Sequence, residues 1–316
     1  MEKKYPNIYD EILLSAVFEL DKFPHKSGQE GTAYFIDENF VIKEMMGDQD
    51  SFFKYENFEK YCRELQDFHK RGLAVPEIYS WTMLPKTMFK NSRFDRYYVL
   101  QERVKGKEIM SKGLSYSYDD CKDFCSREEF NGALLSQQGE LYKKIVLTFL
   151  ENSLKMNEQL AELPESVIEN FILSDYEMMR NEEYGAVDMH SGNVLFDGKK
   201  LTVIDNGFIE NFFATYNDEK VRQIVMKDML RLMSGNLTSL AFGAMVQKKV
   251  PEAKPINKKH KVVCTRVMKR FVNSTNRLLH PVFHDDMEYA NSVDFIKSVA
   301  DKEDEAEILA MLQKDF

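Results

Sequence analysis

The chain contains 316 residues, 43% of them hydrophobic and 30% charged, and these ordinary globular values argue against disorder. This length suits two hydrophobic cores better than one. The formal net charge of −9 disfavours general nucleic-acid binding, and no apolar stretch approaches the roughly 20 residues of a membrane span.

The first residues, Met1 to Tyr5, lack the apolar core of a secretion signal, so we expect the protein in the cytoplasm or in a host cytosol. A helix is predicted around Tyr9 to Leu20. The cysteines are too few and too scattered for a disulfide framework or a closed zinc site, so we expect reduced thiols. They are Cys62, Cys121, Cys125 and Cys264.

Two short segments after this helix are candidates for phosphate contacts. Lys26 to Tyr34 contains Gly28 and Gly31 in a turn, and the backbone N–H groups of residues 28 to 32 could approach phosphate oxygens. Two glycines in a turn are equally typical of a simple hairpin. Phe40 to Lys43 is an apolar run that ends in a lysine, whose point charge suits phosphates or a solvated strand end.

A long helix is predicted over residues 49 to 71, with Leu65 and Phe68 on its apolar face. Arg96 to Gly106 then indicates a strand, rich in β-branched and aromatic residues, that runs into a glycine-terminated linker. We place the domain boundary here. Residues 1–104 form the first predicted domain, and residues 105–316 form the second.

The second domain is predicted to be mostly helical. Its polar segment Ser111 to Gln138 is either part of an acceptor-docking surface or an insertion without functional meaning. Helices are predicted over Leu141 to Leu163, Val167 to Met179 and Val221 to Met233.

The chemistry is concentrated between residues 185 and 207. Val194 to Phe196 and Leu201 to Ile204 read as apolar strands, and Asp197-Gly198 is a strong hairpin signal between them. The hairpin would bring Asp205 beside Asn193. Magnesium prefers hard oxygen ligands, so Asn193 and Asp205 are the candidate metal ligands. Asp188 is the candidate acceptor of the proton from an attacking hydroxyl, and the pattern therefore predicts phosphoryl transfer from ATP.

This segment resembles the catalytic loop and metal-binding triplet of the protein-kinase-like superfamily. The string from Asp188 to Asn193 is similar to the Asp-x-His-x-x-Asn loop of aminoglycoside and choline phosphotransferases. It is also similar to the loop of the early protein kinases of T7-like phages. His190 would brace the loop through a backbone bond.

The resemblance covers about residues 25–235 and implies an α+β, bilobal protein-kinase-like fold. A small β-rich N-lobe with one main helix would sit on a larger, mostly helical C-lobe. Lys43 would order the inner phosphates of ATP. The candidate nucleotide-binding residues of the glycine loop are Gly28, Gly31 and Thr32. Lys43 and Glu64 are two further candidates. The backbone of Glu102 and Val104 would bond adenine, and Gln101 would line the back of this pocket. Tyr61 occupies the position expected for the glutamate that orients the lysine, so we assign Glu64, one turn further along the same face.

Several positions depart from the commonest form of the superfamily. Lys26 replaces the first loop glycine, and Asn206 stands in the middle of the metal-binding triplet. Val187 replaces the arginine that pairs with an activation-loop phosphate, and no Ala-Pro-Glu follows, so we do not expect regulation by phosphorylation of that loop. Asp228 would either accept bonds from the catalytic-loop backbone or lie on a solvated helix face.

The acceptor stays open at this point. A serine or threonine of a protein is the first choice, and a small hydroxyl-bearing molecule of the aminoglycoside or choline type is the alternative. A pseudokinase that binds partners without chemistry is a third reading, and a nucleotidyl transferase a fourth. The expected cofactors are ATP and Mg²⁺, with Mn²⁺ as a substitute. The expected partners are the acceptor molecules, not nucleic acid or membrane.

Charge is uneven in the last third of the chain. Basic residues dominate residues 247–270, and acidic residues dominate residues 285–316. The basic stretch is either a docking patch for an acidic protein or phosphorylated ligand, or one of two solvated faces that partly neutralise each other.

Overall fold

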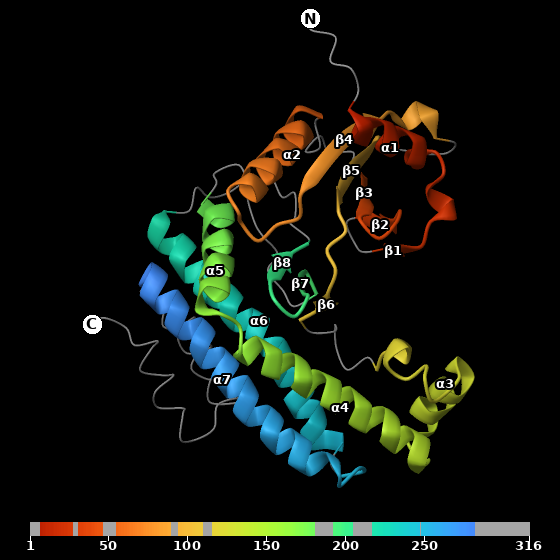
Figure 1. The fold of residues 1–316 in the computed structure, drawn as a ribbon, viewed down its shortest axis with the longest axis vertical. Helices are drawn as coiled ribbons and strands as arrows, with labels where there is room; N and C mark the ends of the chain where they lie inside the picture. Colours follow the sequence, from red (N-terminus) through yellow and green to blue (C-terminus); the bar gives the residue numbers. More distant parts are fainter. Residues whose placement is uncertain are drawn as a thin grey trace, which may run out of the picture.

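The computed structural model describes residues 7–27, 31–46, 55–89, 94–109, 116–180, 192–204, 217–246 and 248–281. Within these ranges the fold is α+β, as predicted. Figure 1 shows a five-stranded sheet near the top, a three-stranded sheet in the middle and a group of long helices below. None of the helices in these ranges combines the length and apolar character needed to cross a lipid bilayer.

The five-stranded sheet is antiparallel throughout and has the order β1-β2-β3-β5-β4. Its strands are β1 (His25–Ser27), β2 (Gly31–Phe35), β3 (Phe40–Met46), β4 (Ile78–Leu84) and β5 (Arg96–Glu102). The strand predicted from Arg96 is therefore confirmed. Tyr97 to Leu100 are all buried, because helices cover both faces of the sheet.

Helices α1 (Ile8–Val17) and α2 (Tyr55–Lys70) pack on opposite faces of this sheet. Leu13 and Val17 of α1 are buried with Ile42, whereas Phe58 and Leu65 of α2 belong to the core on the other face. Both helices were predicted. Asn7 begins α1 with a capping box, which satisfies backbone N–H groups of its first turn, and a short 3₁₀ turn, η1 (Leu20–Lys22), follows.

The three-stranded sheet consists of β6 (Lys107–Glu108), β7 (Val194–Phe196) and β8 (Leu201–Val203), in that order. The predicted hairpin of β7 and β8 is confirmed, with Val194 opposite Val203. Gly198 adopts φ +94°, and the Asp197 carboxylate accepts the N–H groups of Lys199 and Lys200, each at 2.8 Å. Asp-Gly therefore forms the turn for the conformational and hydrogen-bonding reasons that predicted it.

Strand β6 was not predicted, because it follows directly on Gly106 in what reads as a linker. Gly106 adopts φ +148°, and a Cβ atom there would lie 2.7 Å from the carbonyl oxygen of Phe196. Only glycine lets the chain pass β7 this closely and then pair with it.

The remaining described helices confirm that the second part of the chain is mostly helical. They are α3 (Arg127–Ser136), α4 (Gly139–Ala161), α5 (Glu165–Arg180), α6 (Asp218–Val246) and α7 (Ala253–Leu279), with the 3₁₀ turn η3 (Tyr118–Asp120) before α3. The 3₁₀ turn η2 (Lys86–Met88) lies in the first part of the chain, between β4 and β5. α4 and α5 match their predicted ranges closely. α6 continues well past the predicted end at Met233, and the basic stretch proves to be α7.

The polar segment before α4 is ordered where it is described. Tyr118 and Phe130 pack edge to face, and Cys121 and Cys125 are buried beside them in a small core that includes the first half of α4. All four cysteines of the chain are buried free thiols, as predicted. Whether this segment receives an acceptor is untested.

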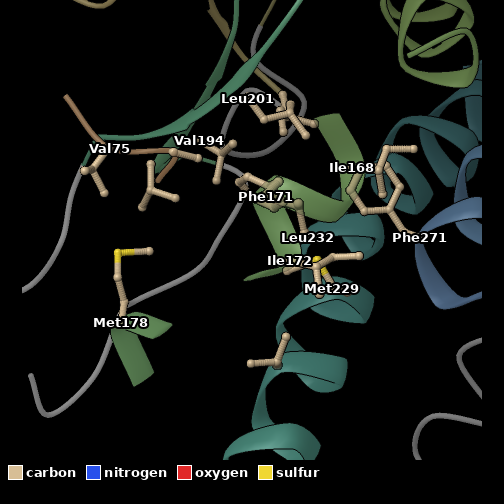
Figure 2. Packing of buried hydrophobic residues seen from close by; sticks show 14 of the residues in the cluster. Val75, Ile168, Phe171, Ile172, Met178, Val194, Leu201, Met229, Leu232 and Phe271 are labelled. Atoms are coloured by element: carbon tan, nitrogen blue, oxygen red, sulfur yellow. The ribbon is translucent and has the colours of Figure 1, made fainter. Parts of the chain in front are cut away.

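The largest core cluster runs from α2 and β5 through β7 and β8 into α5, α6 and α7. Figure 2 shows its centre, where Phe171 and Phe271 lie with ring centroids 6.5 Å apart in an edge-to-face arrangement. Residues on both sides of position 104 belong to this one cluster. The domain boundary stays a prediction.

Candidate functional site

The residue row through Lys43 identifies one face of the five-stranded sheet. Lys26 is opposite Ala33, Ala33 is opposite Lys43, and Lys43 is opposite Val99. Directly opposed residues of antiparallel strands lie on the same face, so these side chains share one face. Val41 and Gln101 are opposed two residues away from Lys43 and Val99, and therefore lie on it as well.

Lys43 joins this sheet to the three-stranded sheet. Its Nζ donates to the carbonyl oxygen of Ile204 at 2.7 Å, although 161 residues separate the two in sequence. The Ile204 N–H in turn donates to the carbonyl oxygen of Asn193 at 2.8 Å. Lys43, the end of β8 and the residue before β7 are thus linked by two consecutive hydrogen bonds.

This arrangement shows where two of the predicted site residues, Lys43 and Asn193, lie. Asn193 is buried, with 8% of its surface exposed, at the start of β7. Asp205 is the next residue after Ile204 in the sequence. Asp205, Gly28, Asp188 and His190 all lie outside the described residues. The predicted roles of these four residues remain predictions.

Gly31 and Thr32 lie at the start of β2 and have structural roles. A Cβ atom on residue 31 would lie 2.1 Å from the carbonyl oxygen of Glu44, so the close approach of β2 to β3 requires glycine. The Thr32 hydroxyl lies 3.1 Å from the Ser27 hydroxyl across the β1–β2 pair. Thr32 is opposite Glu44 and so faces away from Lys43, and its backbone N–H would have to make any phosphate contact.

The predicted adenine-contacting residues follow β5. The Glu102 N–H donates to the Glu77 carbonyl oxygen at 2.8 Å, so a base would have to use the Glu102 carbonyl oxygen. Val104 is half-buried in the linker to β6. Gln101 is 7% exposed, on the face that also carries Lys43.

Glu64 is half-buried on α2, beside the buried Tyr61 and Leu65. Its assignment as the partner of Lys43 stays a prediction.

The sequence did not single out Glu44, which is the neighbour of Lys43 on β3. It is 6% exposed and points to the opposite face of the sheet. Its carboxylate accepts hydrogen bonds from Arg96 at 2.7 Å, from the Tyr34 hydroxyl at 2.8 Å and from the Tyr98 hydroxyl at 3.2 Å. Burial and then Glu44 raise the pKa of Tyr34 to about 12. Residues two apart on a strand share a face, so Glu44 lies on the same face as Ile42, and Arg96 on the same face as Tyr98. A charged residue that shares a face with apolar or aromatic residues is the sequence signal for such a cluster.

Two acids are buried below the hairpin. Asp228 on α6 is 9% exposed, so the solvated-face reading of this residue is wrong. Asp175 on α5 is fully buried, and neither of its carboxyl oxygens accepts a hydrogen bond from the described residues. Burial and then the charge of Asp228 hold the pKa of Asp175 well above its ordinary value. Sequence reasoning missed Asp175, although it lies in helical register with Ile172 and Met179 on the apolar face of α5.

The described residues contain no group of three His, Cys, Asp or Glu side chains that could hold a metal ion. The predicted ligand set does not depend on such a group, because it pairs an amide oxygen of Asn193 with the carboxylate of Asp205. Hard oxygen donors of this kind suit Mg²⁺, and the bond between Asn193 and Ile204 brings their chain segments together.

Comparison of the sequence with protein-family models and with curated proteins finds no match. The site must therefore be interpreted from its own residues.

Proposed function

We propose that this chain is an ATP- and magnesium-dependent phosphotransferase with a bilobal, protein-kinase-like fold. The observation that carries the proposal is the hydrogen bond from Lys43 Nζ to the carbonyl oxygen of Ile204. It brings the only lysine of β3 to the residue that precedes Asp205. The proposal requires that the Asp205 carboxylate, one residue further along the chain, bind the magnesium of a magnesium–polyphosphate complex whose phosphates are bound by Lys43.

The arrangement of the described elements supports the same proposal. A five-stranded antiparallel sheet with α2 precedes a short linker, and the linker leads to the sheet that carries the hairpin. Lys26, Lys43 and the end of β5 all belong to the first sheet. Asn193 and Ile204 flank the hairpin of the second sheet. The nucleotide would lie between the two.

In the proposed reaction, a hydroxyl oxygen of the acceptor attacks the terminal phosphorus of ATP. A new O–P bond forms, the bond from that phosphorus to the bridging oxygen breaks, and ADP leaves with the bond electrons. Asp188 takes the hydroxyl proton. Lys43 holds the inner phosphates. Its ammonium group leaves the carbonyl oxygen of Ile204 and bonds the charged phosphate oxygens, which are stronger acceptors. Asn193 and Asp205 would hold Mg²⁺, which neutralises charge on the phosphates.

The first choice of acceptor is a serine or threonine of a protein. The resemblance of the Asp188 to Asn193 string to the loop of phage protein kinases favours it, and residues 116–138, which pack through Tyr118, Cys121 and Phe130 against α4, would frame the docking surface. A small hydroxyl-bearing acceptor of the aminoglycoside or choline type is the second choice.

The test compares four purified proteins: the native chain, Asp188→Asn, Asp205→Ala and the control Lys22→Ala, which changes an exposed lysine of η1. ATP consumption and label transfer to the chain itself, to lysate proteins and to aminoglycoside and choline-type acceptors are measured with Mg²⁺ and with Mn²⁺. We expect turnover by the native chain and the control and loss of at least a hundredfold in both site variants. Products that gain phosphate mass support phosphoryl transfer, and products that gain AMP mass contradict it. Tight ATP binding without turnover on any acceptor would indicate a pseudokinase instead.

A further inference from the structure

A second lysine on the face that carries Lys43 also reaches the three-stranded sheet. Lys26 of β1 and Lys43 of β3 are each opposite Ala33 of β2, so they share a face and lie two strands apart. Neighbouring strands are separated by just under 5 Å, which places the two backbones roughly 10 Å apart. The Lys26 ammonium forms an ion pair with Glu108.

The partners of the two lysines lie on either side of one strand. Glu108 belongs to β6, Ile204 follows β8, and β7 runs between these strands. The two contacts between the sheets therefore lie on the two sides of β2 in the first sheet and on the two sides of β7 in the second sheet. Ala33 lies between the two lysines, and Leu195 of β7 is opposite Glu108. Figure 1 shows the second sheet, β6 to β8, directly below the first.

The Lys26–Glu108 ion pair has the character of a weak contact. The Lys26 side chain is 70% exposed and the Glu108 side chain 23%, so solvent screens the pair and it adds little to the stability of the fold. Lys26 is followed by Ser27, the last residue of β1, which is paired with Thr32 of β2. A contact at Lys26 therefore acts on the position of the β1–β2 edge of the sheet.

We propose that Lys26 and Glu108 are a positioning pair that holds the β1–β2 edge of the first sheet to β6 of the second sheet and thereby sets the affinity for ATP. This inference rests on the proposed function. It also gives a role to the lysine that replaces the first glycine of the phosphate-covering loop. The pair touches no reacting atom, so it affects nucleotide retention and not the chemical step.

Charge reversal tests the pair. The proteins compared are the native chain, Lys26→Glu, Glu108→Lys and the double reversal, with Lys26→Arg as the conservative variant. The dissociation constant and KM for magnesium-ATP, kcat and the thermal midpoint are measured for each. Each single reversal is expected to raise the dissociation constant and KM about threefold to fivefold, with kcat and the midpoint nearly unchanged. The double reversal and Lys26→Arg are expected to restore native affinity.

The exposed pair Glu19–Lys22 provides a matched control, because it also joins a lysine to a glutamate. Glu19 is the N-cap of η1 and Lys22 is its last residue, so this pair joins no two sheets. Reversing it should leave ATP affinity unchanged. The positioning role is overturned if the double reversal binds ATP as weakly as the single variants, or if no reversal changes affinity while the native chain binds ATP. A native chain that binds no ATP would overturn the proposed function and this inference together.

Discussion

The side-chain amide of Asn157 donates to Nε2 of His260 at 2.9 Å and so joins α4 to α7 inside the core. His260 is completely buried, and burial lowers its pKa to about 4 from an ordinary value of 6.5. Because the amide nitrogen is a donor, Nε2 must be an unprotonated acceptor. Protonation would bring two donors together in a nonpolar site.

Stability should consequently fall in acid through His260. Its folded-state pKa is depressed, so the unfolded chain takes up the proton first as the pH drops below 6.5. The free energy of unfolding is expected to decrease by about 1.4 kcal/mol for each pH unit between 6.5 and 4, and to level off with respect to this group below 4. Urea unfolding at several pH values measures this slope. His260→Gln keeps an acceptor for Asn157 without titrating in this range, and an equal slope in this variant would contradict the assignment.

Asp175 should have the opposite dependence on pH. Its folded-state pKa is raised, so its contribution to stability is present in acid and is lost as the pH rises above its ordinary pKa of 3.8. Asp175→Asn cannot ionise and can donate to Asp228. We therefore expect the stability of the variant relative to the native protein to be greater at pH 8 than at pH 5, as measured by urea unfolding. Asp123→Asn, at an exposed position, is the control. Equal changes in both variants would exclude a special role for the buried acid.

Glu44 and Lys43 are neighbours on β3 with different expected effects. Glu44→Gln weakens three hydrogen bonds on the face away from the second sheet and leaves the half-buried Arg96 charge without its counterion. We expect a loss of about 2–3 kcal/mol of stability and little change in KM for ATP. Lys43→Met should instead abolish most activity and change stability less. Thermal unfolding and ATP kinetics on both variants distinguish these outcomes, and similar profiles would contradict the separation of the two faces.

Gly31 and Gly132 form a matched pair for glycine replacement. Gly31→Ala would place a methyl group 2.1 Å from a β3 carbonyl oxygen, and we expect a loss of several kcal/mol of stability. Gly132 lies in α3, and nothing lies within 4 Å of a Cβ added there, so Gly132→Ala should stabilise the protein by about 0.5–1 kcal/mol. Chemical denaturation measures both changes. A stable Gly31→Ala protein that binds ATP poorly would favour a phosphate role for this glycine over a packing role.

Local signals predicted much of this fold because they coincide with tertiary structure. Asp197-Gly198 specifies its turn through its own backbone and side chain, and the hydrophobic period of α4 and α5 matches their buried faces. Strand β6 has only two residues, and its pairing depends on a glycine conformation and on β7, nearly ninety residues later. No local pattern contains that information.

The two long C-terminal helices illustrate a different limit. α6 passes through Gly235, a residue that weakens helices, and its full length reflects packing against α7 rather than local propensity. The sequence of α7 has an obvious charge pattern, and the helix was not predicted from its buried series Val263, Val267 and Phe271. Pro255 lies in its first turn, where proline is tolerated.

Around the candidate site, the sequence predicted which chain segments meet better than which groups are in contact. The hairpin order implied that the Asn193 and Ile204 segments would meet, and they are hydrogen-bonded. The carbonyl partner of Lys43, the cluster around Glu44 and the buried Asp175 all depend on which residues of distant strands and helices come together. One sequence does not encode these pairings in any local form.

The large core cluster reaches the five-stranded sheet through α2, β4 and β5, and among the described residues it includes no side chain of β1 or β2. The β4–β5 side of the sheet is therefore continuous with this core, whereas β1 reaches the three-stranded sheet through the ion pair of Lys26, whose side chain is 70% exposed. Local unfolding should accordingly begin at β1 and β2, which have the fewest buried apolar contacts with the rest of the protein.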